Sequence, residues 1–459
     1  LSVQPVVTTA EMQAADAAAP VPVEVLVRRA GWAVAEGARA LLGGAYGRRV
    51  VVVAGKGNNG ADGRAAAAVL ARRGARVAVV EAGAAPVLPA SDLVVDAAYG
   101  TGFRGSFAPP DTRGAPVLAV DIPSGVKGDT GAVAGDSLRA VLTVTMAALK
   151  PGLLLGEGPD RSGRVVVADI GLPVGAPAAH VVEDGDRAWL PAPPRTTHKW
   201  KAAVAVVAGS PGMRGAPLLC TRAAFRSGAG MVRLGSPGVP AGEQPAGEAV
   251  AIGLPAAGWA VVMQPELARC AALVVGPGLG RSDDAVAGVR ALVAGAAVPT
   301  VVDADGLNVL GAADEVAAAL RARPAGAGDV VLTPHDGEFA RLAGHPPGED
   351  RVADARALAA RTGAIVLLKG ATTIVAHPSG RALFATAGSP RLATAGTGDV
   401  LSGMVGAFLA RGLDGLRAAA LAAHVHGRAA SFGPPVGLVA GDLPDLIPQA
   451  LTAPAGSVA

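Results

Sequence analysis

Residues 394–404, with the sequence TAGTGDVLSGM, combine residue types that suit phosphoryl transfer. Gly396 and Gly398 let the backbone turn tightly and approach a ligand closely. Asp399 follows them where an apolar helix, expected from 400 to about 409, begins, and the unpaired N–H groups of a helix N-terminus attract phosphate. An aspartate in this place often caps its own helix, but a cap requires no glycines before it. The spacing therefore indicates an anion-binding turn with Asp399 as a candidate base.

A second group that could bind phosphate is Lys369, which follows the apolar strand expected at 365–368. Lysine is rare in this arginine-rich chain, and an ammonium group at a strand end can reach a phosphate as a point charge. Thr372 and Thr373 add hydroxyl donors nearby. We interpret this loop and the turn before Asp399 as two sides of one nucleotide site.

The glycine pattern G-x-G-x-x-G follows a valine-rich strand expected at 49–54 and precedes a helix expected at 64–73. With Glu81 about 20 residues further on, it matches the fingerprint of dinucleotide-binding turns. A lone match of this kind is weak. The side chains of Asn58, Asn59 and Asp62 offer oxygen ligands and hydrogen-bond donors that an ordinary dehydrogenase turn does not.

Two further strands of the first half end in polar residues. Asp96 follows a strand expected at 93–95, and Asp121 and Ser124 follow one expected at 117–120. One such aspartate could belong to a turn. Because the carboxyl ends of parallel strands share one edge of a sheet, where ligands bind, several together favour a site.

The composition is that of a globular chain, with 51% hydrophobic and 17% charged residues. A net charge of +3 without a basic run predicts neither a nucleic-acid nor a membrane partner. Cys220 and Cys270, the two cysteines, make no disulfide framework and are expected to be buried thiols. No signal peptide and no apolar run of about 20 residues is visible. We expect a cytoplasmic enzyme.

The length of 459 residues predicts two or three domains. Strands and helices alternate in both halves, which indicates two α/β domains. A proline-rich stretch of weak periodicity separates them, so the expected organisation is a domain at 1–183, a linker at 184–194 and a larger domain at 195–459. Helices rich in small residues suit close subunit packing and suggest a homo-oligomer, a tetramer or larger.

The motifs GNNGAD, VVDAAYGTGFRG, AVDIPSGVKGDTG and TMAALKPG resemble the NAD(P)H-hydrate epimerase domain over roughly 7–174. This resemblance implies a Rossmann-like three-layer sandwich, with Asp121 as the acid/base that contacts the substrate. It further implies a potassium ion held by Asn59, Asp96 and Ser124. The implied substrate-binding residues, besides Asp121, are Asn58, Asn59, Gly60, Ala61, Asp62, Gly100, Thr101, Gly102, Phe103, Arg104, Gly105 and Ser106.

Ala61 stands where the motif of that family usually has glycine. If the backbone there needed a positive φ or contacted the ligand closely, alanine would strain or block the turn. The epimerase activity is therefore expected to depend on the backbone at Ala61.

The motifs HK, VVGPGLG, VDADGLN, LTPHDGE, LLKGATTIV and TAGTGDVLSGM resemble the ADP-dependent NAD(P)H-hydrate dehydratases over most of 196–449. A ribokinase-like α/β fold is implied. The resemblance implies ADP binding by Lys369, Gly370, Ala371, Thr372, Thr373, Ser389, Gly396, Thr397 and Gly398. It implies contacts to the hydrated nucleotide from Ala216, Gly278, Gly280, His335, Asp336, Gly337, Glu338 and Asp399. Taken alone, a histidine after a strand is more often structural than catalytic.

Together the two resemblances imply a bifunctional repair enzyme for NADH and NADPH hydrates that uses ADP, Mg²⁺ and K⁺. It would interconvert the 6R and 6S hydrates, then dehydrate the S form with release of AMP and phosphate. The alternatives are a ribokinase-superfamily small-molecule kinase, or a dehydratase whose N-terminal domain binds a nucleotide without catalysis. A hydride-transferring dehydrogenase would rest on the glycine pattern alone.

Overall fold

The computed structural model describes residues 4–245 and 247–454, which form two compact units. The first is Gln4–Ala179 and the second begins at His180. This boundary precedes the expected linker at 184–194, because Val182 already donates its N–H to the carbonyl of Phe384 in the second unit. The expected linker itself starts with a 3-10 helix, η1 (Asp184–Trp189).

The sheet of the first unit has six strands in the order β3-β2-β4-β5-β6-β7, all parallel. They are β2 (Arg49–Ala54), β3 (Arg76–Glu81), β4 (Leu93–Ala97), β5 (Val117–Val120), β6 (Leu142–Met146) and β7 (Arg164–Ala168). The chain crosses from β2 to β3 on one side and then returns past β2 to β4 on its other side, as in flavodoxin-like sheets. The topological switch point therefore lies between β2 and β4. A ligand site is expected there.

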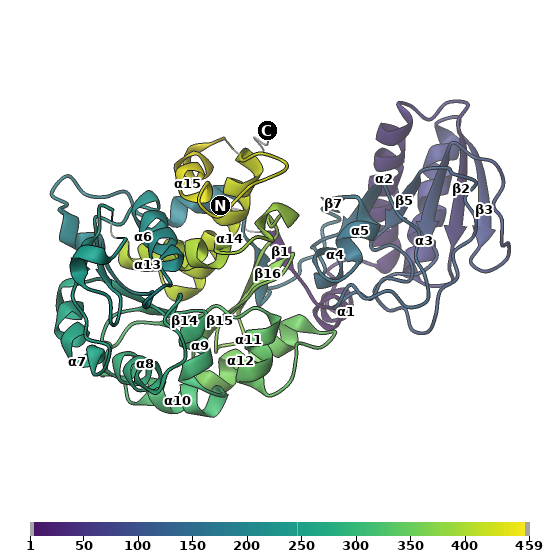
Figure 1. The fold of residues 1–459 in the computed structure, drawn as a ribbon. Helices are drawn as coiled ribbons and strands as arrows, with labels where there is room; N and C mark the ends of the chain where they lie inside the picture. Colours follow the sequence, from purple (N-terminus) through teal and green to yellow (C-terminus); the bar gives the residue numbers. More distant parts are fainter. Residues whose placement is uncertain (1–3, 246, 455–459) are drawn as a thin grey trace. The chain divides into compact units, whose positions relative to one another are not determined.

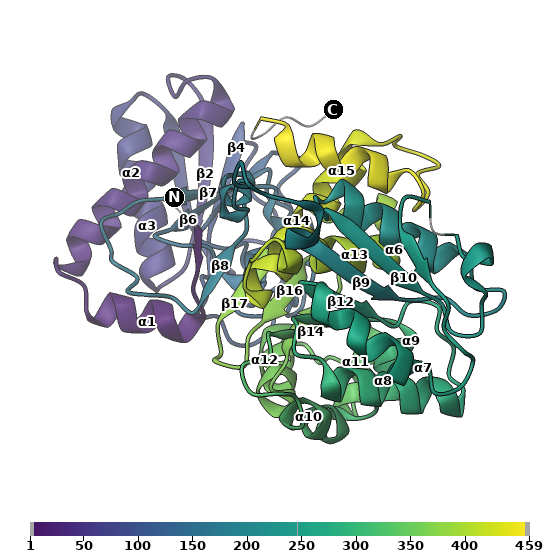
Figure 2. The same cartoon turned by 90° about the vertical axis from the view of Figure 1, so that its left-hand side faces the viewer.

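Helices α2 (Val23–Leu42) and α3 (Asn58–Arg72) cover one face of this sheet (Figures 1 and 2). Leu26, Ala30 and Val34 of α2 are buried in the same apolar cluster as Val50 and Val52 of β2. The opposite face is covered mainly by irregular chain with buried Leu88, Phe107 and Ala140. The unit also contains β1 (Gln4–Val6), α1 (Thr9–Ala17), α4 (Pro151–Leu154) and α5 (Gly158–Ser162).

The second unit has a larger sheet in the order β8-β17-β16-β15-β14-β13-β12-β9-β10-β11. Its strands are β8 (Ala179–Val181), β9 (Ala203–Val207), β10 (Met231–Gly235), β11 (Val250–Ile252), β12 (Ala272–Val275), β13 (Thr300–Val302), β14 (Val330–Leu332), β15 (Ile365–Leu368), β16 (Thr373–Ala376) and β17 (Ala382–Ala385). From β9 to β15 the pairing is parallel, and β16 and β17 are antiparallel. Here the switch point lies between β9 and β12.

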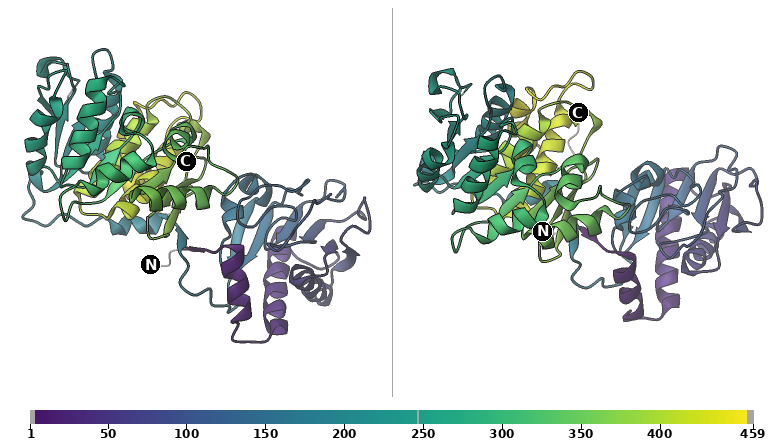
Figure 3. Two further views of the ribbon diagram at one scale, coloured as in Figure 1. Left: turned by 90° about the horizontal axis from the view of Figure 1, so that it is seen from below. Right: turned by 60° about the horizontal axis from the view of Figure 1, so that its bottom comes forward.

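Helices cover both faces of this sheet (Figures 1 and 3). On one face lie α6 (Gly215–Arg226), α13 (Thr397–Ala410), α14 (Gly415–Phe432) and α15 (Leu443–Thr452). On the other lie α7 (Trp259–Met263), α8 (Asp283–Gly295), α9 (Asp305–Leu310), α10 (Ala313–Arg321), α11 (Asp336–Ala343) and α12 (Arg351–Thr362). The 3-10 helices η2 (Lys199–Ala202), η3 (Ala241–Glu243), η4 (Gln264–Arg269) and η5 (Pro390–Leu392) complete the unit.

Helix α13 is packed closely against its neighbours, and this fixes its N-terminus. A Cβ atom at Gly403 would lie 2.2 Å from the carbonyl oxygen of Cys220 in α6. A Cβ at Gly406 would lie 2.4 Å from a methyl group of Val274 in β12. The absence of these side chains lets α13 lie directly on α6 and the sheet.

Within residues 4–245 and 247–454, no helix is long and apolar enough to cross a membrane. Both Cys220 and Cys270 are buried free thiols, as expected from the sequence.

Candidate active sites

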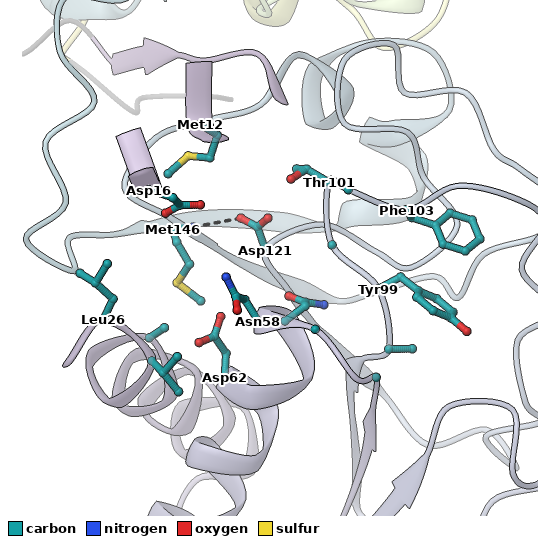
Figure 4. A pocket seen from close by; sticks show the side chains of 18 of the residues that line it. Met12, Asp16, Leu26, Asn58, Asp62, Tyr99, Thr101, Phe103, Asp121 and Met146 are labelled. Carbon is teal, nitrogen blue, oxygen red and sulfur yellow. Dashed lines mark hydrogen bonds between the residues drawn. The ribbon is translucent and has the colours of Figure 1, made fainter. Parts of the chain in front are cut away.

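A cavity of about 930 Å³ opens at the switch point of the first unit. It lies between the turn after β2 and the turn after β4, and α1 and α2 contribute to its wall (Figure 4). A concave site of this size at a switch point is the usual location of a nucleotide or other small ligand in such sheets.

Asp121 is the most constrained side chain at this cavity. Its Oδ1 accepts hydrogen bonds from Lys150 Nζ (2.5 Å), Thr145 Oγ1 (3.2 Å) and the N–H of Met146 (3.4 Å). The Lys150 side chain is fully buried. Asp121 also has φ of +67°, which is rare and costly for a residue other than glycine, and such strain gathers at functional sites.

The three residues expected to hold a cation lie around the turn after β4. Ser124 Oγ donates to Asp96 Oδ1 (2.6 Å), and the N–H of Tyr99 donates to Ser124 Oγ (2.9 Å). The Asn59 side chain lies beside Gly100, and neither its Oδ1 nor its Nδ2 has a hydrogen-bond partner although both atoms are buried. A buried amide without a partner is unfavourable unless a ligand satisfies it.

The expected substrate-binding residues of the first unit divide into two groups. The cavity is lined by Asn58, Asn59, Asp62, Gly100, Thr101, Gly102, Phe103 and Asp121. The remaining residues, which do not line it, are Gly60, Ala61, Arg104, Gly105 and Ser106.

The expected start of the helix after the glycine pattern, at residue 64, is wrong. Helix α3 begins at Asn58 with Gly57 as its N-cap, so residues 58–62 form its first turns. Ala61 donates its N–H to the carbonyl of Gly57 (3.0 Å), and its φ is not positive. The backbone therefore gives no reason for alanine to strain this position.

Gly60, in contrast, has a steric requirement. A Cβ there would lie 1.9 Å from the carbonyl oxygen of Gly55. We expect Gly60→Ala to destabilise the protein by about 1–3 kcal/mol through this overlap. The matched variant Ala61→Gly should cost at most about 1 kcal/mol, from helix propensity alone. Denaturant unfolding of the two variants measures the difference, and equal losses would contradict the placement of the two residues.

The sequence did not single out Asp16 and Lys150 as site residues, yet both line this cavity. Asp16 lies near the end of the short helix α1, and Lys150 precedes a proline, so neither position carries a local pattern of chemistry. The only available indication of Lys150 was its position in the motif TMAALKPG.

In the second unit, buried Asp303 connects three elements at the carboxyl edge of the sheet. Its Oδ1 accepts hydrogen bonds from Lys369 Nζ (2.7 Å) and Thr333 Oγ1 (2.7 Å), and its Oδ2 accepts one from Ser402 Oγ (2.6 Å) of α13. Lysine and α13 thus approach each other as the sequence indicated. The lysine is not isolated, because Asp303 fixes its ammonium group beside the helix N-terminus.

Asp399 lies in the first turn of α13 and does not cap it. The N-cap is Gly396, with φ of +92°, and it makes no side-chain cap. The helix therefore starts at Thr397, three residues before the expected start. Burial, with a smaller contribution from the nearby carboxylate of Asp303, raises the pKa of Asp399 to about 7. This value suits a general base that works near neutral pH.

A cavity of about 370 Å³ lies against this end of α13. The expected nucleotide-binding residues that line it are Lys369, Gly370, Ala371, Thr373, Ser389, Thr397 and Gly398. Thr372 and Gly396 are not among the lining residues. His426 of α14, which the sequence did not single out, also lines it, and burial lowers its pKa to about 4.

Of the residues expected to contact the hydrated nucleotide, Ala216, Gly278 and Gly280 lie at the switch point between β9 and β12, whereas His335 to Glu338 follow β14. Gly278 faces Ala216, whose Cβ would lie 3.1 Å from a Cβ built on that glycine. The N–H of Gly280 donates to Asp305 Oδ2 (3.0 Å). Asn308, one turn further along α9, accepts a hydrogen bond from Arg341 Nε (2.7 Å) of α11. These bonds connect the glycine turn to the helix that follows His335.

His335 has a structural task that its loop position did not reveal. It is the N-cap of α11, and its Nδ1 accepts the N–H of Gly337 (2.9 Å), while Glu338 accepts the N–H of His335 (3.0 Å). Asp336 is paired with Arg351 (2.7 Å). The backbone N–H groups of His335 and Gly337 thus both have partners within this helix start. This favours the structural interpretation of His335.

The second unit thus has the architecture of a ribokinase-like protein. A ribokinase-like superfamily protein from Enterococcus faecalis superposes with a TM-score of 0.51 at 20% identity, over 60% of this chain and 96% of its own. A family model for NAD(P)H-hydrate dehydratase matches residues 204–449, and one described as YjeF-related protein N-terminus matches 23–89 and 83–152.

Two relatives match this chain across both units. The bifunctional NAD(P)H-hydrate repair enzyme of Salinibacter ruber is 39% identical over 97% of this chain and 96% of its own length. That of Mycobacterium tuberculosis strain H37Rv is 41% identical over 88% of each. The chain belongs to the family of bifunctional NAD(P)H-hydrate repair enzymes.

Proposed function

We propose that this chain repairs hydrated NADH and NADPH in two steps. The first unit interconverts the 6R and 6S hydrates, and the second dehydrates the S form at the expense of ADP, giving NAD(P)H, AMP and phosphate. The observation that carries the proposal is that relatives of one bifunctional kind match both units over nearly the whole chain.

The dehydration has to remove a hydroxyl group from C6 of the nicotinamide ring, and hydroxide is a poor leaving group. Asp399 would accept the hydroxyl proton while that oxygen attacks the β-phosphorus of ADP, and the bond from the β-phosphorus to the bridging oxygen breaks to release AMP. The new phosphate ester leaves C6 as the ring-nitrogen lone pair moves in. Loss of a proton from C5 to water then restores the C5–C6 double bond.

Two groups at the second cavity would stabilise the transferred phosphoryl group. The N–H groups of the first turn of α13 and the ammonium of Lys369, which Asp303 holds in place, are donors of the kind that neutralise developing charge. We expect Mg²⁺ to be held by the phosphate oxygens of the nucleotide, where it supplies further charge neutralisation. Phosphate oxygens are hard donors that suit such a cation.

In the first unit, Asp121 would move protons at C6 while this centre opens and recloses. Asn59, Asp96 and Ser124 would hold K⁺, and the unpartnered buried amide of Asn59 fits that role. A bound K⁺ would supply positive charge and order beside the turn that faces the substrate.

The experiment that tests the proposal uses purified protein, the S epimer of NADH hydrate and ADP. Reduced nicotinamide, AMP and phosphate should appear in equal amounts, and none without the nucleotide. A small-molecule kinase would transfer phosphate to a stable alcohol and would produce no reduced nicotinamide.

A dehydrogenase is disfavoured by two observations. The strand order is not the 3-2-1-4-5-6 order of dinucleotide-binding dehydrogenases. Glu81, which would have to bind a ribose hydroxyl, is paired with Arg64 (2.6 Å).

The raised pKa of Asp399 gives a prediction for the pH dependence. A carboxyl group acts as a base only when ionised, so kcat/KM for the S epimer should fall about tenfold per pH unit below about pH 7 and level off above it. Initial rates from pH 5.5 to 9 check this. A flat profile through pH 7 would contradict the role of Asp399 as the base.

We further expect a cytoplasmic homo-oligomer of four or more subunits. Buried free thiols suit a reducing compartment. Light scattering on the purified protein measures the assembly, and a monomer at micromolar concentration would contradict it.

A further inference from the structure

Three carboxyl groups face the cavity of the first unit, from three separate elements. Asp16 comes from α1, Asp62 from α3 and Asp121 from the turn after β5, and their side chains point into the same space (Figure 4). The other charged residues that line the cavity are Lys56, Glu81 and Lys150. Glu81 is paired with Arg64, so it contributes little net charge.

Only one of the three carboxyl groups has a cation in contact. Lys150 Nζ donates to Asp121 Oδ1, to Thr145 Oγ1 (2.9 Å) and to the carbonyl of Met146 (2.9 Å), which uses all three of its protons. Within the described residues, the structure gives neither Asp16 nor Asp62 a hydrogen-bond or ion-pair partner for its carboxyl group. Asp121 is thus the one of these three carboxyl groups that Lys150 contacts directly.

Asp16 and Asp62 lie near other negative charge in a partly buried site. Burial, followed by the charges of Asp121 and Asp16, raises the pKa of Asp62 to about 8. Burial and Asp121 also raise the pKa of Asp16, against the opposing effect of Lys150. Near neutral pH Asp62 is therefore held mainly as the carboxylic acid, in the same cavity as the Asp121 carboxyl group that Lys150 contacts. Such a pair can act as an acid and a base in one site.

We propose that Asp62 is the catalytic acid that works with Asp121 in the epimerase step, and that Asp16 is a positioning residue whose charge adds to the effect of burial and Asp121 in keeping Asp62 protonated. This inference rests on the proposed function of the first unit. It gives Asp62 a chemical role beyond contact with the substrate.

The step balances without any co-reactant. Asp121 takes the proton of the C6 hydroxyl, the C6–oxygen double bond forms, and the bond from C6 to the ring nitrogen breaks with its electron pair passing to nitrogen. Asp62 gives its proton to that nitrogen, which leaves an open-chain aldehyde. After rotation of the aldehyde, the nitrogen attacks the other face of C6 and returns its proton to Asp62, while the oxygen regains the proton from Asp121.

The test follows consumption of the R epimer by the full chain with ADP. Asp62→Asn keeps the size of the side chain but cannot give a proton to the ring nitrogen. It should lower the rate on the R epimer by about 100-fold or more. Turnover of the S epimer, which the second unit carries, reports that the variant is folded and supplies the second step. An R-epimer rate equal to that of the wild type would overturn the proposal.

The pH profile separates the two aspartates. The wild-type rate on the R epimer should decline above about pH 8, where Asp62 loses its proton. Asp16→Asn removes a like charge, so this decline should begin at lower pH. An unchanged profile would overturn the role of Asp16, and this measurement remains available if Asp62→Asn does not fold.

The outcomes also distinguish the role of Asp62 from the epimerase function proposed for the first unit. If the wild type does not consume the R epimer above the uncatalysed rate, the proposed epimerase function of the first unit fails. If the wild type consumes it and Asp62→Asn does so equally, that function stands and only the role of Asp62 is wrong.

Discussion

Replacing Asp399 by asparagine should lower turnover of the S epimer by about 10³-fold, within the range for loss of a general base. Asparagine keeps the volume at the first turn of α13 but cannot accept the hydroxyl proton. The ion pair of Lys369 with Asp303 should remain, since neither side chain is hydrogen-bonded to the Asp399 side chain. ADP should therefore still bind, which calorimetry can measure beside the rate of NADH formation.

Two controls accompany this variant. Conversion of R to S epimer, followed by chromatography, should be unchanged because it takes place in the other unit. Asp314→Asn changes an exposed aspartate that is paired with Arg361, and it should leave both activities intact. S-epimer turnover near the wild-type level in Asp399→Asn would contradict the proposed base.

Replacing Asp121 by asparagine should have the second large effect, because it removes both a base and the partner of a buried ammonium. We expect the rate on the R epimer to fall by about 10²–10⁴-fold. The unpaired Lys150 should also destabilise the first unit by about 3–5 kcal/mol, since its side chain is fully buried. Stopped assays on the R epimer and denaturant unfolding measure the two effects separately.

The double variant Asp121→Asn/Lys150→Met separates chemistry from stability. Removing the ammonium together with its partner should recover much of the lost stability, while the epimerase rate remains low. If activity returned together with stability, Asp121 would be a structural residue only.

Much of the sheet architecture was predictable because its strands are buried on both faces. The runs of valine in β2 and of apolar residues in β12 and β15 have no alternation, as is typical of parallel strands between helices. The polar residues that follow them then had to lie at one sheet edge. For this reason the sequence alone indicates Asp121, Lys369 and the glycine turns as site residues.

Two helix starts were wrong for the same physical reason. The segments before α3 and α13 are rich in glycine and polar residues, which have low helix propensity and suggest a loop. In the folded chain, Gly57 and Gly396 act as N-caps, and helical hydrogen bonds begin directly after them. Tertiary packing, such as the close approach of α13 to α6, outweighs the local preference.

The partners of the reactive groups were not predictable. The contact of Lys369 with Asp303 joins residues 66 positions apart, and that of Lys150 with Asp121 joins residues 29 apart. Such pairs depend on strand order, which no local pattern specifies. Asp16 was missed because its charge is relevant only in the folded chain, where other elements bring Asp62 and Asp121 to the same cavity.

The most direct test of the account is the extent of repair of a mixed-epimer NADH hydrate. The intact chain is incubated with limiting mixed hydrate and excess ADP, and absorbance of reduced nicotinamide is followed to completion in a time short compared with spontaneous epimerisation. Two active units predict that all of the hydrate is converted to NADH. Conversion that stops at the fraction of S epimer would contradict a catalytic first unit, and no conversion at all would contradict the proposed function of the second.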